Sequence, residues 1–235
     1  MQRYFASITN NNVKLSLEDE HHILHVMRMR AGEKIEVVDS SNLYICEIVN
    51  VSPLEIKVLK QKEEDVEINK QITLFFALAK GDKIDLVMQK ATELGVHRIV
   101  LFKSKRCVVS FDNKDFSKKI VRYNKIVKEA AEQCHRLVVP SIEGVIELKD
   151  IGNYLSDVNL VAYEKEAGNT ADSFNLNKDI ESVSIMIGSE GGFDEEEISF
   201  LKEKGFKVIS LGKRILRCET AAIYALSVLA YQLEK

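Results

Sequence analysis

The chain contains no apolar run long enough to cross a bilayer. A transmembrane helix needs about 20 consecutive apolar residues, and the longest candidate here, Ala221–Ala230, is short and includes Tyr224 and Ser227. The N-terminal residues lack the long apolar core of a secretory signal peptide. We therefore expect a cytoplasmic protein that does not associate with membranes.

Proline and cysteine are scarce, and the cysteine pattern argues against a metal site. Two prolines and eleven glycines leave no low-complexity linker in 235 residues. The cysteines form no C-x-x-C pair and no H-E-x-x-H sequence occurs, so we expect no metal. Reduced thiols are the default state in a cytosolic protein. The four cysteines are Cys46, Cys107, Cys134 and Cys218.

Neither sign of charge dominates the chain. The formal net charge is -3, from 33 basic and 36 acidic residues, which argues against a protein that coats nucleic acid nonspecifically. RNA recognition stays open, because phosphate contacts depend on local basic patches rather than on net charge. The apolar content of 46% is that of a globular protein. The length allows one large domain or two modest ones.

Residues 1–70 predict a β-rich first domain. Short β-branched runs are separated by turn signals that contain serine, asparagine and proline. Ser16 and Asp19 resemble the start of one helix, which Gly32 is expected to end. A small antiparallel barrel with one helix fits this order. The expected strands are Glu33–Asp39, Leu43–Val51 and Glu55–Lys60.

Beyond the polar stretch Gln61–Gln71, which is the expected boundary, strands alternate with helices. Ile72–Leu78 is a continuous apolar run, typical of a strand that is buried on both faces. Asp82 is expected to cap a helix that ends at Gly95. The alternation predicts a mostly parallel sheet covered by helices on both faces. Further expected strands are Arg98–Phe102, Leu160–Tyr163, Val183–Ile187 and Val208–Leu211, and further expected helices are Asp115–Cys134, Asp194–Lys204 and Glu219–Leu233.

A glycine-bearing segment follows the expected strand Val183–Ile187. Gly188 stands at the carboxyl end of that strand, where ligands bind in open α/β sheets, and glycine lets a backbone approach a ligand closely. Asp194 is expected to cap the next helix, whose acidic first turn, Glu195–Glu197, would repel a phosphate. An adenosine without phosphates, attached to a cationic sulfonium, fits better, and S-adenosylmethionine matches that description. A tight turn with no ligand is equally consistent with the spacing.

A second segment of the same kind lies closer to the C-terminus. Gly212 follows another expected strand and precedes the last helix. Lys213, Arg214 and Arg217 place three cations within a short stretch, which suits a phosphodiester substrate beside a nucleoside pocket. The alternative is a solvated basic turn in which Arg217 pairs with Glu219.

Both segments resemble the second and third knot motifs of a known family. Residues 187–193 read I-G-S-E-G-G-F, and residues 211–221 read L-G-K-R-I-L-R-C-E-T-A. The sequence is similar to the RsmE family of 16S ribosomal RNA (uracil N3)-methyltransferases in the SPOUT superfamily, through nearly the whole chain. Further matches lie at residues 3–5, 21–30, 79–83, 89–96, 129–136 and 139–140.

Three positions depart from the family pattern. Ser189 and Lys213 stand where proline is usual or frequent, and Cys218 stands where threonine is frequent. Loss of a proline would loosen a cofactor loop, because fewer backbone states are forbidden. None of the three changes removes a side chain with an obvious catalytic role, so we expect activity to be kept.

The resemblance implies a fold, a reaction and an assembly. The fold would be α/β, with a SPOUT trefoil-knot methyltransferase domain over residues 71–235, preceded by a small PUA-like RNA-binding β-barrel over residues 1–70. The reaction would be methyl transfer from S-adenosylmethionine to N3 of a specific uridine in 16S ribosomal RNA, within the small ribosomal subunit. The assembly would be a homodimer with the active site at the subunit interface.

The resemblance also implies roles for individual residues. Arg217 is the leading candidate for stabilising the uridine anion. Glu219 is the leading candidate for receiving the proton or positioning the base, although it fits equally as a residue that caps the last helix or holds Arg217. Arg136 and Glu93 are reserve catalytic candidates, and Glu190 would face the sulfonium or bind a ribose hydroxyl. The set implied for cofactor binding is Leu78, Ile187, Gly188, Glu190, Gly191, Leu211, Gly212, Ile215, Leu216, Thr220 and Ala221. The basic residues expected to contact RNA are Arg3, Arg28, Arg30, Arg106, Arg122 and Lys125. The resemblance supports Arg3, Arg28 and Arg30, whereas the other three belong to local basic clusters that fit equally as solvated surface.

Two other functions stay open at this point. A non-enzymatic RNA-binding assembly factor would keep the fold, but it would have no need of the two glycine-bearing motifs. A SPOUT enzyme that acts on transfer RNA is the other alternative, although the N-terminal match to the ribosomal RNA family argues against it. The last helix carries a stripe of small and apolar residues that suits either a subunit interface or an internal core face. The stripe consists of Ala221, Ala225, Val228 and Leu229.

Overall fold

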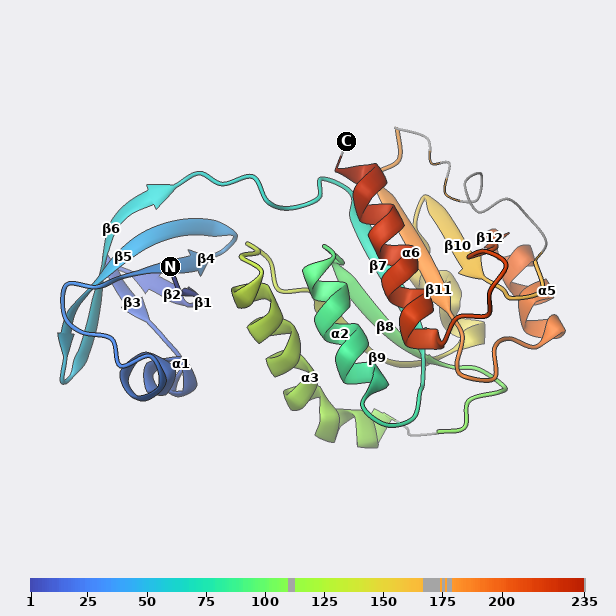
Figure 1. Cartoon of the computed structure of the whole chain (residues 1–235), viewed down its shortest axis with the longest axis horizontal. Helices are drawn as coiled ribbons and strands as arrows, with labels where there is room; N and C mark the ends of the chain where they lie inside the picture. The colour runs from blue at the N-terminus through green and yellow to red at the C-terminus, as the bar shows by residue number, and fades with distance from the viewer. Residues whose placement is uncertain (110–112, 167–173, 175, 177–178, 235) are drawn as a thin grey trace. The chain divides into compact units, whose positions relative to one another are not determined.

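The structure, a computed structural model, describes residues 1–109, 113–166, 174, 176 and 179–234 (Figure 1). The chain divides into two compact units. The first unit is Met1–Glu67 with Ala131–Val138, and the second is Ile68–Ala130 with Val139–Lys235. The sequence placed a boundary between residues 70 and 71, but nothing in it indicated that the segment from 131 to 138 joins the first unit.

The first unit is built on a six-stranded sheet with the order β1-β4-β5-β6-β3-β2. Neighbouring strands run antiparallel, except that β1 and β4 are parallel. The parallel pair departs from the antiparallel barrel expected, because a hairpin and a helix separate the two strands and return the chain in the same direction. The strands are β1 (Arg3–Phe5), β2 (Ser7–Thr9), β3 (Asn12–Lys14), β4 (Lys34–Asp39), β5 (Asn42–Val51) and β6 (Leu54–Lys62).

The helix that the sequence predicted in residues 1–70 is shorter than expected. Helix α1 (Leu17–His21) begins at Ser16, whose hydroxyl accepts a hydrogen bond of 3.1 Å from the backbone N–H of Asp19. A π-helical turn, η1 (His22–Val26), continues it. The chain then leaves the helix, and Arg28 adopts a positive φ of 53°. The helix therefore ends before Gly32, where the sequence placed its end.

The second unit contains a six-stranded, wholly parallel sheet with the order β12-β10-β11-β7-β8-β9. Strand β9 escaped prediction because most of its side chains are only partly buried and give a weak apolar signal. The strands are β7 (Gln71–Ala77), β8 (Arg98–Lys103), β9 (Ser141–Glu147), β10 (Val158–Ala162), β11 (Ser182–Ile187) and β12 (Phe206–Ile209). The helices are α2 (Lys83–Glu93), α3 (Asn113–Gln133), α5 (Glu195–Glu203) and α6 (Cys218–Leu233), with a 3₁₀ segment η2 (Leu148–Tyr154).

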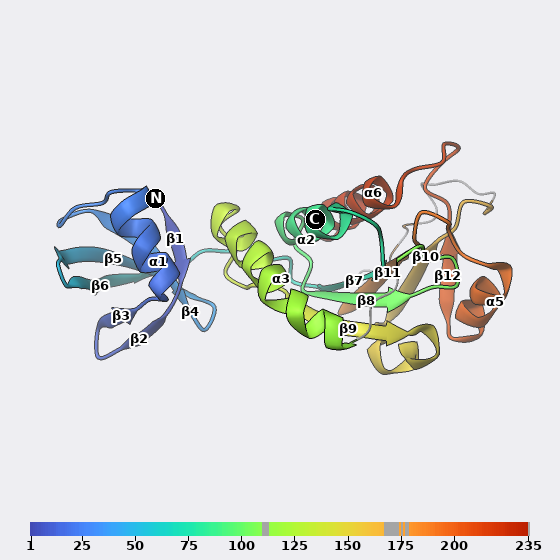
Figure 2. The same cartoon turned by 90° about the horizontal axis from the view of Figure 1, so that it is seen from below.

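Helices cover both faces of this sheet, as the alternating pattern predicted. Figure 2 shows α2 and α6 on one side of the sheet and α5 on the other. Along β7, Leu74 and Phe76 belong to the core beneath α2 and α6, whereas Phe75 belongs to the core beneath α5. All three side chains are fully buried, which explains the continuous apolar run.

Strand β12 lies two residues earlier in the chain than the sequence predicted. The ring of Phe206 packs edge-on against Phe75, with ring centroids 6.2 Å apart, so that the strand begins at Phe206. It ends at Ile209, and Ser210 and Leu211 leave the sheet to line a cavity. The shift therefore places the second glycine-bearing segment at the edge of the sheet.

The two helix starts predicted to be capped by aspartate differ. The Asp194 side chain accepts from the backbone at the start of α5, and Glu197 completes a capping box, which confirms that prediction. Asp82 is the N-cap residue of α2, as the sequence predicted, but its side chain makes no capping hydrogen bond. No helix of the described chain is long and apolar enough to span a membrane.

The small-residue stripe on the last helix belongs to the interior of the second unit. Ala221, Ala225 and Leu229 pack into the core between α6 and the sheet. The opposite face of α6 carries Tyr224 and Tyr231, whose side chains are 40% and 65% exposed. The internal core face, one of the two alternatives for the stripe, is thus the one the structure shows.

Candidate functional site

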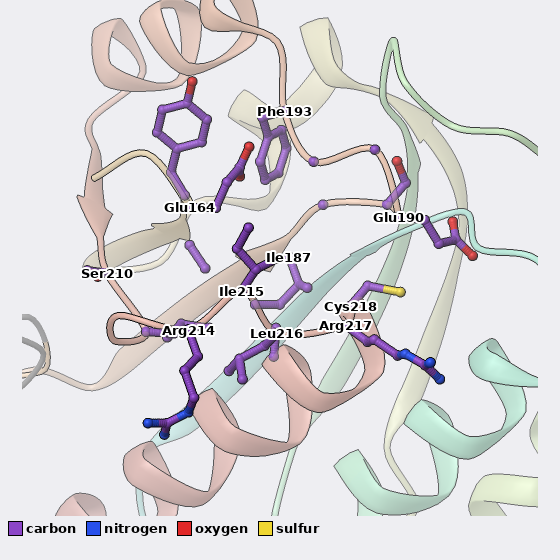
Figure 3. Close-up of a pocket in the computed structure, with 18 of the residues that line it drawn as sticks. Glu164, Ile187, Glu190, Phe193, Ser210, Arg214, Ile215, Leu216, Arg217 and Cys218 are labelled. Carbon is purple, nitrogen blue, oxygen red and sulfur yellow. The ribbon is translucent and has the colours of Figure 1, made fainter. Parts of the chain in front are cut away.

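A cavity of about 540 Å³ opens at the carboxyl ends of β10, β11 and β12 (Figure 3). Its wall consists of residues 162–164, 187–193 and 210–218, with single residues from α2 and α6. The three strands are parallel neighbours, so their following loops emerge at the same edge of the sheet. This edge is where ligands bind in open α/β sheets.

Glycines let the wall of the cavity fold tightly. A Cβ atom added at Gly188 would lie 3.1 Å from the ring of Phe193, and one added at Gly191 would lie 2.8 Å from Cβ of Arg106. The loop backbone therefore has no room for larger residues at these two points. Most of the cofactor set expected from the sequence lines this cavity: Ile187, Gly188, Glu190, Gly191, Leu211, Gly212, Ile215, Leu216 and Ala221.

Two members of the expected cofactor set do not line the cavity. Leu78 is fully buried just after β7, where its backbone N–H donates a hydrogen bond of 3.0 Å to the carbonyl of Phe102. Thr220 lies on the outer face of α6, in a shallow groove with Tyr224 and Tyr231. Consecutive side chains on a helix point about 100° apart, so Thr220 turns away from the cavity that its neighbour Ala221 lines.

An ion pair joins two segments of the wall. The ammonium Nζ of Lys83, at the start of α2, lies 2.8 Å from Oε1 of Glu190, in the loop after β11. The same oxygen accepts a hydrogen bond of 3.0 Å from the backbone N–H of Lys80. Burial alone would raise the pKa of Glu190, but these two hydrogen bonds outweigh it and the pKa is lowered. The hydrogen bond to Glu190 raises the pKa of Lys83 in turn.

Glu219 lies beside this ion pair. Its Oε2 is 4.0 Å from Nζ of Lys83 and 3.3 Å from Sγ of Cys218. Burial raises the pKa of the Cys218 thiol to about 12, so the thiol stays protonated and donates to the carboxylate. The structure gives Glu219 these partners and shows no ion pair with Arg217 among the described residues.

Arg217 precedes α6 in extended backbone geometry and lines the cavity. Its side chain caps no backbone group of the helix. Figure 3 shows Arg214 and Arg217 extending in different directions from the same loop, with Ile215 between them in the sequence. Ile215 is 87% exposed at the cavity wall. An apolar side chain this exposed is the kind of surface that a ligand or partner covers.

The two reserve catalytic candidates do not line the cavity. Glu93 pairs with Lys90 on the surface of α2, at 2.8 Å. Arg136 belongs to the first unit, where its guanidinium is buried and lies 2.7 Å from the carboxylate of Glu67. Both contacts are those of structural ion pairs.

The structure contradicts the expectation that Arg3 contacts RNA. The Arg3 side chain is fully buried in the first unit. Its guanidinium donates to the carboxylates of Glu36, at 2.8 Å, and Glu64, and to the carbonyl of His135. Arg3 therefore holds the segment from 131 to 138 against the sheet of the first unit, and its donors are not available to a phosphate.

The other five basic candidates are exposed. Arg28 and Arg30 lie in the first unit, after the π-helical turn. Arg122 and Lys125 lie on α3, within reach of Asp85 and Glu129 respectively. Arg106 packs against the glycine-bearing loop after β11. Its guanidinium donates a hydrogen bond of 3.3 Å to the carbonyl of Gly191 and lies 3.5 Å from Asp194.

Sequence reasoning missed several residues of the wall. The sequence patterns gave no individual role to Lys83, Glu164 or Ser210, all three of which line the cavity. The signal that finds Glu164 is its position directly beyond the carboxyl end of β10, the same rule that indicated Gly188. In the described part of the chain, no group of three or more histidine, cysteine, aspartate and glutamate side chains is arranged to hold a metal ion.

Family models match most of the chain. The model of an RNA methyltransferase domain matches residues 66–230, and the model of an RNA methyltransferase PUA domain matches residues 18–61. Ribosomal RNA small subunit methyltransferase E of Bacillus subtilis is 36% identical over 251 residues, which cover 100% of this chain and 98% of the relative. The chain belongs to the RsmE family. The relative of the same name from Buchnera aphidicola is 34% identical, over 97% of this chain and 93% of its own length.

A solved structure of an RsmE protein has the same fold. Ribosomal RNA small subunit methyltransferase E from Neisseria gonorrhoeae, solved bound to S-adenosyl methionine, superposes with a TM-score of 0.88. It is 28% identical, and the match covers 99% of this chain and 98% of that one. The RsmE resemblance predicted from the sequence is thus confirmed, with a SPOUT methyltransferase domain preceded by a PUA-like domain. The trefoil knot stays a prediction.

Proposed function

We propose that this RsmE-family chain transfers a methyl group from S-adenosylmethionine to N3 of a specific uridine in 16S ribosomal RNA. The observation that carries the proposal is the glycine-lined cavity with Arg217 in its wall and Glu219 beside it. The Neisseria gonorrhoeae relative, named a small subunit methyltransferase and solved with S-adenosyl methionine, supports both the cofactor and the reaction class.

The residues of the cavity suit an adenosine without phosphates. Leu211 and Leu216 offer apolar surface for a base, and the missing side chain at Gly188 lets the backbone approach it. Asp194 and Glu197 occupy the backbone donors at the start of α5 through the capping box. That helix start is therefore closed to a phosphate.

The reaction requires that uridine lose the proton on N3, because the nitrogen lone pair is unavailable until then. When bound, S-adenosylmethionine supplies an electrophilic methyl group. Arg217 has no ion-pair partner among the described residues, and its guanidinium is available to stabilise the uridine anion. Holding the two reactants together contributes further to the rate.

Glu219 has the position of a proton acceptor or of a residue that orients the base. It is mostly buried at the start of α6, where its Oε2 lies 4.0 Å from the ammonium of Lys83. The thiol of Cys218 donates to the same carboxylate oxygen, so the cysteine that replaces the usual threonine still supplies a donor.

We further propose that the protein acts as a homodimer in the cytoplasm, on the small ribosomal subunit. The exposed apolar groove on α6, which includes Ile223, Tyr224 and Tyr231, is the face that a second copy would cover. Exposed Arg28 and Arg30 of the first unit, with the basic side of α3, are the proposed contacts to RNA phosphates.

Titration calorimetry with S-adenosylmethionine tests the proposed function. The unmodified protein should bind the cofactor, and Gly188→Trp should abolish binding by filling the cavity. Thermal unfolding of the variant checks that the fold is kept. Absence of binding by the unmodified protein, measured with and without ribosomal RNA, would contradict the proposal and favour a non-enzymatic RNA-binding protein.

A further inference from the structure

Glu164 is the acidic residue of the cavity wall that has no partner among the described residues. It follows β10 at the carboxyl edge of the sheet. The neighbouring acids are engaged: Glu190 pairs with Lys83 at 2.8 Å, and Glu195 pairs with Lys165 at 2.7 Å. Glu164 therefore presents two acceptor oxygens that no cation or donor of the described chain occupies.

The loop opposite Glu164 is shaped around its carboxylate. A Cβ atom added at Gly192 would lie 2.9 Å from Oε1 and 3.0 Å from Oε2 of Glu164. Gly192 also has a φ of 65°, in the left-handed region that favours glycine. Figure 3 shows the Glu164 carboxylate beside Phe193, on the opposite side of the cavity from Glu190. Gly192, which follows Gly191 in the loop, thus leaves space for the Glu164 carboxylate at the cavity wall.

A carboxylate in this position is suited to a pair of neighbouring hydroxyl groups. An ionised carboxylate only accepts hydrogen bonds, and its two oxygens match the two donors of a ribose diol. Acidic side chains beyond the carboxyl ends of strands bind nucleoside ribose in this way in other α/β folds. Glu190 is less suited, because Lys83 and the backbone of Lys80 already occupy its Oε1.

From this geometry we propose that Glu164 binds the ribose hydroxyls of the adenosine in the cavity. The inference rests on the proposed cofactor. It assigns the ribose contact to Glu164, whereas the sequence offered Glu190 as a candidate for that contact. Glu164 is then a residue that selects a ribonucleoside ligand over its deoxy counterpart.

The test measures binding rather than activity. Titration calorimetry compares S-adenosylhomocysteine with its analogue that lacks the 2′- and 3′-hydroxyls, on the unmodified protein, on Glu164→Gln and on Glu164→Ala. Glu203→Gln, an exposed residue on α5, is the matched control. We expect Glu164→Ala to weaken binding of the ribose ligand about tenfold to a hundredfold and to change binding of the dideoxy analogue less than twofold. Glu164→Gln keeps one acceptor oxygen, so its affinity for the ribose ligand should lie between those of the unmodified protein and Glu164→Ala.

The outcomes separate this inference from the proposed function. Equal losses for both ligands would overturn it, because Glu164 would then act on the amino-acid part of the ligand or on the loop. Unchanged binding of the ribose ligand by both Glu164 variants would overturn it as well, while the proposed function would stand. Failure of the unmodified protein to bind S-adenosylhomocysteine would refute the proposed cofactor itself.

Discussion

Lys83 and Glu190 form a 2.8 Å ion pair that ties the start of α2 to the loop after β11. A cation at a helix N-terminus is unfavourable, because the helix dipole places partial positive charge there. Glu190, with Glu219 at 4.0 Å, offsets that cost. Two carboxylates, from segments far apart in the sequence, are thus held at the cavity by one ammonium group.

The first prediction concerns this ammonium group. Lys83→Met should weaken binding of the neutral-sulfur ligand S-adenosylhomocysteine about fivefold, near 1 kcal/mol, because the loop that carries Glu190 loses a partly exposed partner. The loss for S-adenosylmethionine should be smaller, because Glu190 is then available to the cationic sulfonium. Titration calorimetry with both ligands, on Lys83→Met and on the unmodified protein, measures the two losses of affinity.

Lys90→Met is the control for this prediction, since Lys90 lies on the same helix and pairs only with Glu93 in the described contacts. It should leave both affinities unchanged. A larger loss for S-adenosylmethionine than for S-adenosylhomocysteine in Lys83→Met would show that Lys83 does not compete for Glu190.

The second prediction concerns the close contact at Gly191. The Cβ atom of Gly191→Ala would lie 2.8 Å from Cβ and 3.0 Å from the carbonyl oxygen of Arg106, so the cofactor loop must shift. We expect a loss of about 1–3 kcal/mol in the free energy of unfolding and weaker cofactor binding. Gly152→Ala, with no atom within 4 Å of the new Cβ, should stay within about 0.5 kcal/mol. Chemical denaturation measures the free energy of unfolding of both variants. Equal values would contradict the close packing of Gly191 against Arg106.

The third prediction is a pH dependence that arises in the first unit. Burial alone would raise the pKa of Glu67, but hydrogen bonds from Arg136, Leu137 and Val138 outweigh it and the pKa is lowered. A carboxylate with a lowered folded pKa contributes stability that is fully present above its ordinary value of 4.5 and is lost as pH falls through the folded value. Glu67→Gln should cost about 3 kcal/mol at pH 7, because the buried guanidinium of Arg136 loses its 2.7 Å ion pair with the Glu67 carboxylate.

Denaturation followed by circular dichroism, at pH 7 and in steps from pH 5 to pH 3, measures this effect. The difference in free energy of unfolding between the unmodified protein and Glu67→Gln should disappear as the pH falls below about 4.5. Glu63→Gln changes an exposed neighbour and should have the same free energy of unfolding as the unmodified protein at every pH. A difference in unfolding free energy between Glu67→Gln and the unmodified protein that stays constant down to pH 3 would contradict the role given to the Glu67 carboxylate.

The strands and the glycine-bearing loops were the most predictable parts of the molecule. The continuous apolar run at β7 and the position of Gly188 after β11 follow from local patterns alone, and both were confirmed. Thr220 shows the limit of such reasoning. Its neighbour Ala221 lines the cavity, but a motif gives no helical phase, and the structure turns Thr220 to the outer face of α6.

Long-range contacts explain the remaining differences. Arg3 reads as an exposed basic residue in the sequence, but the structure pairs it with Glu36, 33 residues away, and with the carbonyl of His135. Lys83 and Glu190 are separated by 107 positions, and no local pattern connects them. These contacts are set by tertiary packing, which local sequence patterns do not reveal.

The fourth prediction concerns assembly. Tyr224→Asp places a charge in the exposed apolar groove on α6 and should convert the proposed homodimer into a monomer, since an unpaired buried charge is costly at an interface. Analytical ultracentrifugation reads the mass directly. Val121→Asp, at a 75% exposed position on α3, should leave the dimer intact, and a dimeric Tyr224→Asp would place the interface elsewhere.

Methyl transfer to uridine N3 can be read from the nucleosides of the product RNA. Small ribosomal subunits that lack the modification are incubated with the protein and methyl-labelled S-adenosylmethionine, and the nucleosides of the 16S RNA are then analysed by mass spectrometry. We predict that N3-methyluridine appears at one position, and that Arg217→Ala reduces its rate of formation by about a hundredfold or more. Label in another nucleoside, in transfer RNA alone, or in no RNA at all would contradict the account.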